Sequence, residues 1–230
     1  MIAPNHSITA RILSRSGHPV QHLVLEMPDG FQFRPGQYLE VVHSDGPIPL
    51  SIASAPHRLP ELHLHYLPQP DAPEAARMDE LLDAGRTLEI RGPAGNVQLP
   101  DAPIQPVLLV AGGTGAAQAM SFIDAYRANP PDVAVTLLWC ADADSDFYLE
   151  DELRAIREPW FHCVLLADAR RTPQNRGLQW LRRHGPSHRR STIVLCGGPG
   201  FVWSAYDALA DAGVAPTRMQ SDVFSYAPRG

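Results

Sequence analysis

Residues 107–115 read Val-Leu-Leu-Val-Ala-Gly-Gly-Thr-Gly and lead directly into a helix-compatible segment at 116–127. An uninterrupted apolar run of this kind is typical of a strand buried on both faces of a parallel sheet. Further apolar runs begin at Val133, His162 and Thr192, roughly every 30 residues, which is the spacing of the βαβ unit. We therefore predict an α/β domain with a parallel sheet. Its remaining elements are helices at 149–157, 178–183 and 201–212 and a short strand near 223–226.

The first half of the chain follows a different pattern, in which short alternating segments are broken by Gly and Pro. Several short strands with turn residues between them are typical of an antiparallel barrel or sandwich. A helical insertion is predicted at 73–82, where Met78, Leu81 and Leu82 share one face. The pattern changes after the proline-rich stretch 100–106, so we place the domain limits at 1–102 and 103–230. The predicted strands of the first domain are 8–13, 20–27, 38–42, 50–53, 62–67, 87–90 and 97–99.

Composition narrows the class of protein. The 230 residues are 44% hydrophobic, which suffices for a sizeable core, and the formal net charge is −6. This charge argues against nucleic acid or a membrane as a partner bound by bulk charge. All 19 basic residues are arginine, so lysine Schiff-base chemistry and a Walker-type phosphate loop are excluded.

The cysteines and the N-terminal residues indicate the cellular compartment in which the protein is expected. Cys140, Cys163 and Cys196 lack zinc and iron–sulphur spacing, and a sparse, odd count fits a reducing compartment. The first residues resemble no signal peptide, and no apolar run reaches the ~20 residues of a membrane helix. We therefore expect a cytoplasmic protein without a metal site.

Two glycine-rich turns are the clearest candidates for a binding site. Each follows a predicted parallel strand and precedes a helix, where backbone N–H groups and the helix dipole favour an anion. Because both turns lie at the carboxyl ends of strands, they are expected to border one crevice. Taken alone, the first is also compatible with a plain βα turn, and Cys196 with a small buried hydrophobe. The residues are Gly112, Gly113, Thr114 and Gly115 in the first turn, and Cys196, Gly197, Gly198 and Pro199 in the second.

The first domain contains a third signal. The segment 31–38 includes Arg-Pro-Gly-Gln-Tyr, and Pro49, Leu50 and Ser51 follow it. A hydroxyl-bearing strand next to proline is able to present Ser51 to a flat ring. Taken alone, the segment fits an edge strand with a proline-containing bulge better.

The order of these motifs resembles the ferredoxin–NADP reductase superfamily, and within it the small NAD(P)H:flavin oxidoreductases. The motifs are the barrel, Arg-Pro-Gly-Gln-Tyr, Pro-Leu-Ser, Gly-Gly-Thr-Gly, Cys-Gly-Gly-Pro and a C-terminal Asp-x-Phe-x-Tyr at 222–226, and they cover nearly the whole chain. The resemblance implies a six-stranded flavin-binding β-barrel followed by a nucleotide-binding α/β domain, with the flavin ring at their interface. It also implies that Pro49, Leu50 and Ser51 lie along the isoalloxazine with the Ser51 hydroxyl near N5. The first glycine turn would receive the nucleotide pyrophosphate, and Cys196 would lie near the nicotinamide.

Two departures from the family pattern concern the flavin phosphate tail. Ile48 occupies the position at which relatives usually carry an arginine that clamps a phosphate. The phosphate loop that normally follows is not recognisable, and residues 65–70 occupy its place. We therefore predict a weakly bound, dissociable flavin held mainly through its ring. The same departures would also suit a chain that has stopped using flavin.

Several residues leave alternatives open. Asp142 and Asp144 near a ribose would favour NADH over NADPH, whereas Arg170 and Arg171 would reverse that preference. His63 and His65 have a metal-compatible spacing, but we place them on the outer or interface face of the barrel, where His65, with Tyr66, is a candidate flavin contact. The basic run at 182–190 fits a solvated patch better than a docking site for an acidic partner.

The predicted function is an oxidoreductase in which NADH or NADPH reduces FMN, FAD or riboflavin. Ser51 and Cys196 are its candidate catalytic residues, because hydride transfer needs orientation rather than a strong base. One alternative keeps the flavin bound and passes electrons to an oxygenase or a ferric acceptor. Another is a nucleotide-binding regulatory subunit without turnover.

Overall fold

The computed structural model describes residues 7–68 and 73–229. Its contacts divide the chain into two compact units. The first comprises Met1–Gln98 and Met120–Ala128, and the second comprises Leu99–Ala119 and Asn129–Gly230. One helix, α2, thus has its first residues in the second unit and the remainder in the first. The domain limits of 1–102 and 103–230 stay a prediction.

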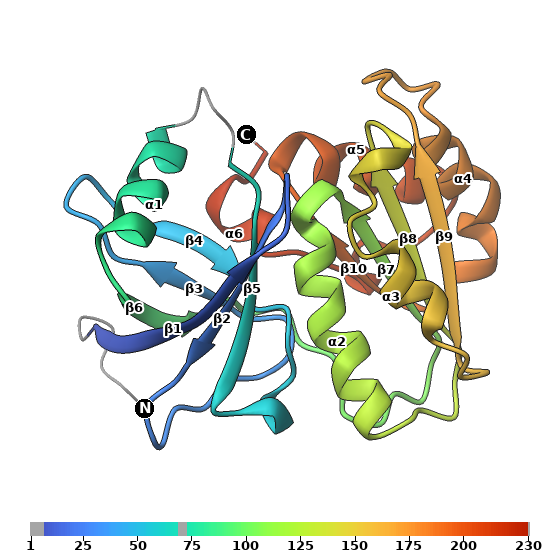
Figure 1. Cartoon of the computed structure of the whole chain (residues 1–230). Coiled ribbons are helices and arrows are strands. Elements are labelled where there is room, and N and C mark those ends of the chain that lie inside the picture. The colour runs from blue at the N-terminus through green and yellow to red at the C-terminus, as the bar shows by residue number, and fades with distance from the viewer. Residues whose placement is uncertain (1–6, 69–72, 230) are drawn as a thin grey trace. The chain divides into compact units, whose positions relative to one another are not determined.

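The first unit is built on a six-stranded antiparallel sheet in the order β4-β3-β6-β1-β2-β5 (Figure 1). A bridge between Ile52 and Leu64 joins the region after β4 to β5, so the two ends of the sheet meet as in a barrel. This confirms the fold class predicted for the first half. The strands are β1 Ile8–Ser16, β2 Gln21–Glu26, β3 Tyr38–Val41, β4 Ile48–Ser51, β5 Glu61–Tyr66 and β6 Thr87–Ala94.

The core of this unit comes from alternate strand positions. Leu23 and Leu25 of β2 and Leu62 and Leu64 of β5 are fully buried, as a strand period of two requires. The predicted helical insertion is α1, Pro73–Ala84, and its Met78 and Leu82 join the barrel core. The predicted strand at 97–99 is wrong. The chain leaves β6 at Gly95, whose φ of +100° turns it away from the sheet.

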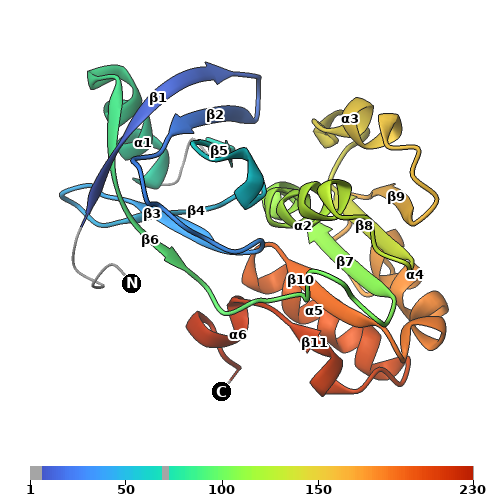
Figure 2. The same ribbon diagram turned by 90° about the horizontal axis from the view of Figure 1, so that it is seen from below.

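The second unit is built on a five-stranded parallel sheet in the order β11-β10-β7-β8-β9. Figure 2 shows α3 on one face of this sheet and α4 and α5 on the other. The apolar runs found in the sequence are its strands, and Leu108, Leu109 and Val110 are fully buried. The strands are β7 Val107–Gly112, β8 Val135–Ala141, β9 Phe161–Ala167, β10 Thr192–Cys196 and β11 Met219–Gln220. The helices are α3 Glu150–Ala155, α4 Arg176–His184, α5 Pro199–Asp211 and α6 Val223–Tyr226, and the helix divided between the two units is α2, Ala116–Ala128.

The C-terminal segment differs from the prediction. Residues 223–226 form the short helix α6 rather than a strand, because the sheet ends three residues earlier with β11. Phe224 packs against the rings of Trp203 and Tyr206 on α5, which fixes the segment against that helix. Among the described residues, no helix combines the length and the apolar character needed to cross a bilayer.

Candidate functional site

The two predicted glycine turns lie side by side. β7 and β10 are neighbouring parallel strands, and Ala111 is in register with Cys196 at their carboxyl ends. The turn Gly113–Gly115 follows β7, and a Cβ at Gly115 would stand 2.4 Å from the carbonyl oxygen of Cys196. No real side chain tolerates that distance from backbone, so glycine at 115 permits the close approach of the two turns. The structure thus brings together the residues that the sequence proposed as one site.

The first turn is anchored on one side and open on the other. Gly113 has a φ of +53°, and a Cβ placed on it would meet nothing within 4 Å. Its carbonyl oxygen accepts hydrogen bonds from the indole N–H of Trp139, at 2.9 Å, and from the backbone N–H of Ala116. Because the carbonyl is held toward β8 and α2, the amide of Thr114 in the same planar peptide points the opposite way. This orientation suits an anion at the start of α2.

The second turn surrounds a buried thiol. Cys196 is 1% exposed, and burial, followed by the charge of Asp222, raises the pKa of its thiol above the ordinary value. The thiol therefore stays protonated and is not a nucleophile. Asp222 itself accepts a hydrogen bond from the Gln118 amide at 2.8 Å. Gly197 has a φ of +141°, and Gly198 and Pro199 begin α5. The contact of these residues with a nicotinamide stays a prediction.

In the barrel unit, β4 sends alternate side chains to opposite faces. Ile48 and Leu50 belong to the core, at 2% and 8% exposure, whereas Pro49 is exposed and Ser51 is half-buried. Among the described residues, the Ser51 hydroxyl makes no hydrogen bond within the chain. Ser51 and Pro49 therefore fit a flat ligand on the outer face. Because the Leu50 side chain faces inward, its predicted contact with the flavin ring would have to involve its backbone.

The core position of Ile48 bears on the flavin tail. Its side chain packs opposite Val41 in the barrel interior, so residue 48 offers no cation on the outer face. The described residues of β4 thus supply no phosphate clamp at this position, and their contact with a flavin ring stays a prediction. Of the segment 65–70 that takes the place of the phosphate loop, residues 69 and 70 lie outside the described residues.

His65 and Tyr66 on β5 are both buried. Tyr66 belongs to the barrel core, and the His65 ring stacks on His22 with a centroid separation of 4.4 Å. Burial, then the neighbouring His22 and His63, lower the pKa of His65 to about 3, so the ring is neutral. A neutral imidazole is able to donate or accept a hydrogen bond. The predicted contacts of His65 and Tyr66 with flavin stay predictions.

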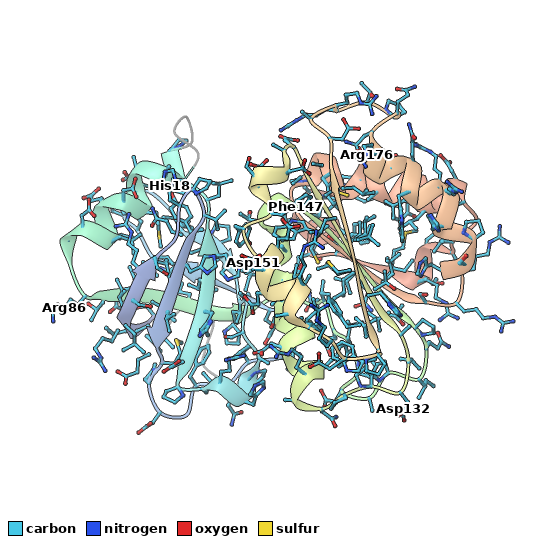
Figure 3. All side chains as sticks on the ribbon, turned by 45° about the vertical axis from the view of Figure 1, so that its right-hand side comes forward. His18, Arg86, Asp132, Phe147, Asp151 and Arg176 are labelled. Atoms are coloured by element: carbon cyan, nitrogen blue, oxygen red, sulfur yellow. The ribbon has the colours of Figure 1, made fainter. Side chains whose placement is uncertain are left out.

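The carboxyl ends of β8 and β9 carry two ion pairs. Arg171 contacts Asp142 at 3.0 Å, and Arg170 binds Asp168 through two guanidinium nitrogens. The hydrogen bonds from Arg170 hold the pKa of Asp168 below its ordinary value. Arg170 is therefore occupied, and Asp142 and Arg171 are the pair that a ribose at this edge would meet. Asn175 caps α4, which begins at Arg176 (labelled in Figure 3).

The sequence did not reveal three residues that support these motifs. Trp139 anchors the first turn, and the edges of Phe147 (labelled in Figure 3) and Tyr148 meet its ring. Asp124 and Arg58 form a bidentate pair in the first unit. The available signal for this pair was a charged Asp within the mostly apolar segment 116–126, since a charge that becomes buried needs a partner.

Comparison with known proteins identifies the family. Residues 109–206 match the family described as oxidoreductase NAD-binding domain. The chain is 30% identical over 234 residues to terephthalate 1,2-dioxygenase reductase component 1 of Comamonas sp., covering 96% of this chain and 69% of that protein. It is also 30% identical to a probable flavin reductase of Vibrio harveyi, covering 88% of this chain and 92% of that one.

Solved structures agree with this fold. The Amycolatopsis cytochrome P450 reductase GcoB superposes with a TM-score of 0.81 at 25% identity, over 94% of this chain and 69% of that one. A ferredoxin NADP+ reductase from Neisseria gonorrhoeae with bound FAD and NADP gives 0.75 at 19% identity, over 94% and 98% of the two chains. Together with the two relatives at 30% identity, the barrel and the parallel sheet establish that this chain belongs to the ferredoxin–NADP reductase superfamily.

Proposed function

We propose that this protein is an NAD(P)H-dependent oxidoreductase that reduces FMN, FAD or riboflavin, with the flavin bound weakly enough to exchange. The observation that carries the proposal is the packing of Gly115 against Cys196 at the carboxyl ends of β7 and β10. Parallel sheets bind nucleotides at that edge, and backbone N–H groups there suit a pyrophosphate. The family match over 109–206 and the relative named as a flavin reductase support the same activity.

When both ligands are bound, the nicotinamide and the flavin supply the hydride chemistry, and the chain supplies binding and orientation. The turn containing Gly113 and Thr114 would hold the pyrophosphate through its backbone N–H groups. Cys196 and Gly197 would shape the nicotinamide pocket. The Ser51 hydroxyl would donate a hydrogen bond near the flavin N5. No general base is required, and the protonated Cys196 is consistent with a steric role.

Weak flavin binding follows from β4. Because Ile48 lies in the core, the phosphate tail receives no guanidinium from that position. Binding would then depend mainly on the ring, and riboflavin would serve about as well as FMN or FAD.

A second candidate is a reductase that retains its flavin and passes electrons to a partner. The relative named terephthalate 1,2-dioxygenase reductase component 1 favours an oxygenase partner, and a ferric acceptor is the other class we consider. A chain that binds nucleotide without turnover is the third candidate.

Steady-state oxidation of NADH and NADPH with riboflavin, FMN and FAD separates these candidates. A colourless protein that oxidises NAD(P)H only with added flavin supports the main proposal. A yellow protein, as purified, supports the reductase that retains flavin. A colourless protein that binds NADH yet reduces none of the flavins would overturn both enzymatic candidates.

A further inference from the structure

Asp124 is a buried carboxylate with an unusually complete set of partners. It lies on α2 in the part of the helix that belongs to the first unit, and its residue is 6% exposed. Arg58 donates to it twice, from Nε to Oδ2 and from Nη2 to Oδ1, each at 2.6 Å, and the backbone N–H of Ala55 donates to Oδ2 at 2.9 Å. Burial is the largest influence on this carboxyl and opposes its ionisation. The hydrogen bonds from Arg58 and Ala55, together with the electrostatic influence of Arg58 and His57, outweigh burial and hold the pKa of Asp124 below its ordinary value.

Ser121, one helical turn earlier on α2, contacts the same segment of the first unit as Asp124. Its hydroxyl donates to the carbonyl oxygen of Ser54 at 2.7 Å and accepts from the backbone N–H of Gly36 at 3.4 Å. Residues three apart on a helix share a face, so Ser121 and Asp124 hold consecutive residues of one segment. Gly36 belongs to the Arg-Pro-Gly-Gln-Tyr motif, and Ser54 lies three residues after Ser51.

The held segment continues directly from β4. After Ser51, the N–H of Ile52 donates to Gln37 at 3.0 Å, and the N–H of Ala53 donates to His63 at 2.8 Å. Ser54 and Ala55 are then fixed by Ser121 and Asp124. Every residue from Ser51 to Ala55 is thereby tied to a neighbouring strand or to α2, which leaves the end of β4 little freedom to reorient.

We propose that Asp124 is a positioning residue that, through Ala55 and Arg58, holds the segment after Ser51 so that the Ser51 hydroxyl keeps one orientation toward the flavin. This inference rests on the proposed function. The Asp124 carboxylate is buried but the Arg58 side chain is 41% exposed, and an ion pair of this kind is a weak source of stability. What a bidentate carboxylate adds is direction, because two parallel hydrogen bonds and a backbone N–H allow only one arrangement.

The test separates the effect of the pair on orientation from its effect on stability. The double variant Asp124→Leu/Arg58→Met replaces the pair by apolar groups. It is expected to fold with a lower melting temperature, because the buried N–H of Ala55 loses its acceptor, so the rates are compared at a temperature well below the unfolding transition of the variant. We expect the rate of flavin reduction at saturating NADH, measured by rapid mixing, to fall at least fivefold. The Kd for NADH should stay within twofold. Arg58→Lys, which keeps a charge and a donor, should recover part of the lost rate.

The matched control removes another ion pair of the same unit. Arg11 and Glu26 on β1 and β2 are joined at 2.7 Å on the barrel surface, and Arg11→Met/Glu26→Leu should leave the reduction rate unchanged. A folded Asp124→Leu/Arg58→Met variant that reduces flavin within twofold of the wild-type rate would overturn this inference alone. A wild-type protein that fails to reduce any flavin would overturn the proposed function, and this inference with it.

Discussion

The indole N–H of Trp139 donates to the carbonyl oxygen of Gly113 at 2.9 Å, so a fully buried side chain of β8 fixes the turn that follows β7. The two strands are paired, with Ala111 opposite Trp139, which places the indole directly beneath the turn. The turn is therefore set by the sheet before any ligand arrives.

Trp139→Phe tests how much the hydrogen bond from Trp139 to Gly113 contributes to nucleotide binding. An aromatic ring is retained, whereas the indole N–H and its hydrogen bond, worth about 1 kcal/mol, are lost, so the Kd for NADH should rise about fivefold. The Kd for reduced nicotinamide mononucleotide, which lacks the pyrophosphate, should change little. Titration of both ligands measures the difference.

The control is Trp180→Phe, because Trp180 lies on α4, where its ring stacks on His184. An equal loss of affinity for both ligands in Trp139→Phe would show that the anchor does not act through the pyrophosphate.

Gly115→Ala should weaken both the fold and nucleotide binding. The added methyl would stand 2.4 Å from a backbone oxygen that has no flexible side chain to move aside. Overpacking of this kind costs about 1–3 kcal/mol, which thermal unfolding should report as a lower melting temperature. Gly200→Ala is the matched control, since a Cβ there meets nothing within 4 Å and alanine favours a helix. A Gly115→Ala protein as stable as Gly200→Ala would contradict the close packing of the two turns.

The strands of the second unit could be predicted because the sequence signal for each of them is local. Residues 107–110 are apolar without interruption, and the glycines that follow can only end a strand at a turn. The meeting of Gly115 and Cys196 also followed from sequence, since the carboxyl ends of parallel strands share an edge. By contrast, Asp124 and Arg58 are 66 residues apart, and no local pattern links them.

Two errors have a physical reason. The apolar residues at 223–226 suited a strand as well as a helix, and only the packing of Phe224 on Trp203 decides for α6. Polar and apolar residues alternate over 97–99 as in a strand, but the positive φ of Gly95 turns the chain away from the sheet before this segment. The alternation of Ile48 to Ser51 in sequence already predicts that Leu50 faces inward, which conflicts with the flavin contact that the family resemblance implies for its side chain.

The pair Asp142–Arg171 should set the preference between NADH and NADPH. Asp142→Ala leaves Arg171 available to a 2′-phosphate and should raise the NADPH:NADH ratio of kcat/KM. Arg171→Ala leaves the carboxylate and should lower that ratio. Because both side chains are largely exposed, each change should be about two- to fivefold and should shrink at high salt. Asp151→Ala, at an exposed position of α3, is the control. Two variants that shift the ratio in the same direction would contradict the assignment.

His65 should make the barrel sensitive to acid. Its pKa is about 3 in the folded chain, against an ordinary value of 6.5, so below pH 6.5 only the unfolded chain takes up the proton. Stability should therefore be complete above pH 6.5 and fall as the pH drops toward 3, by about 2 kcal/mol between pH 6.5 and 5 from this group alone. Urea unfolding at the two pH values measures the loss. His65→Leu should remove that part of the pH dependence, whereas His162→Leu, at an exposed position of β9, should keep it. A pH dependence that is the same in His65→Leu and in the wild type would show that the proton is taken up elsewhere.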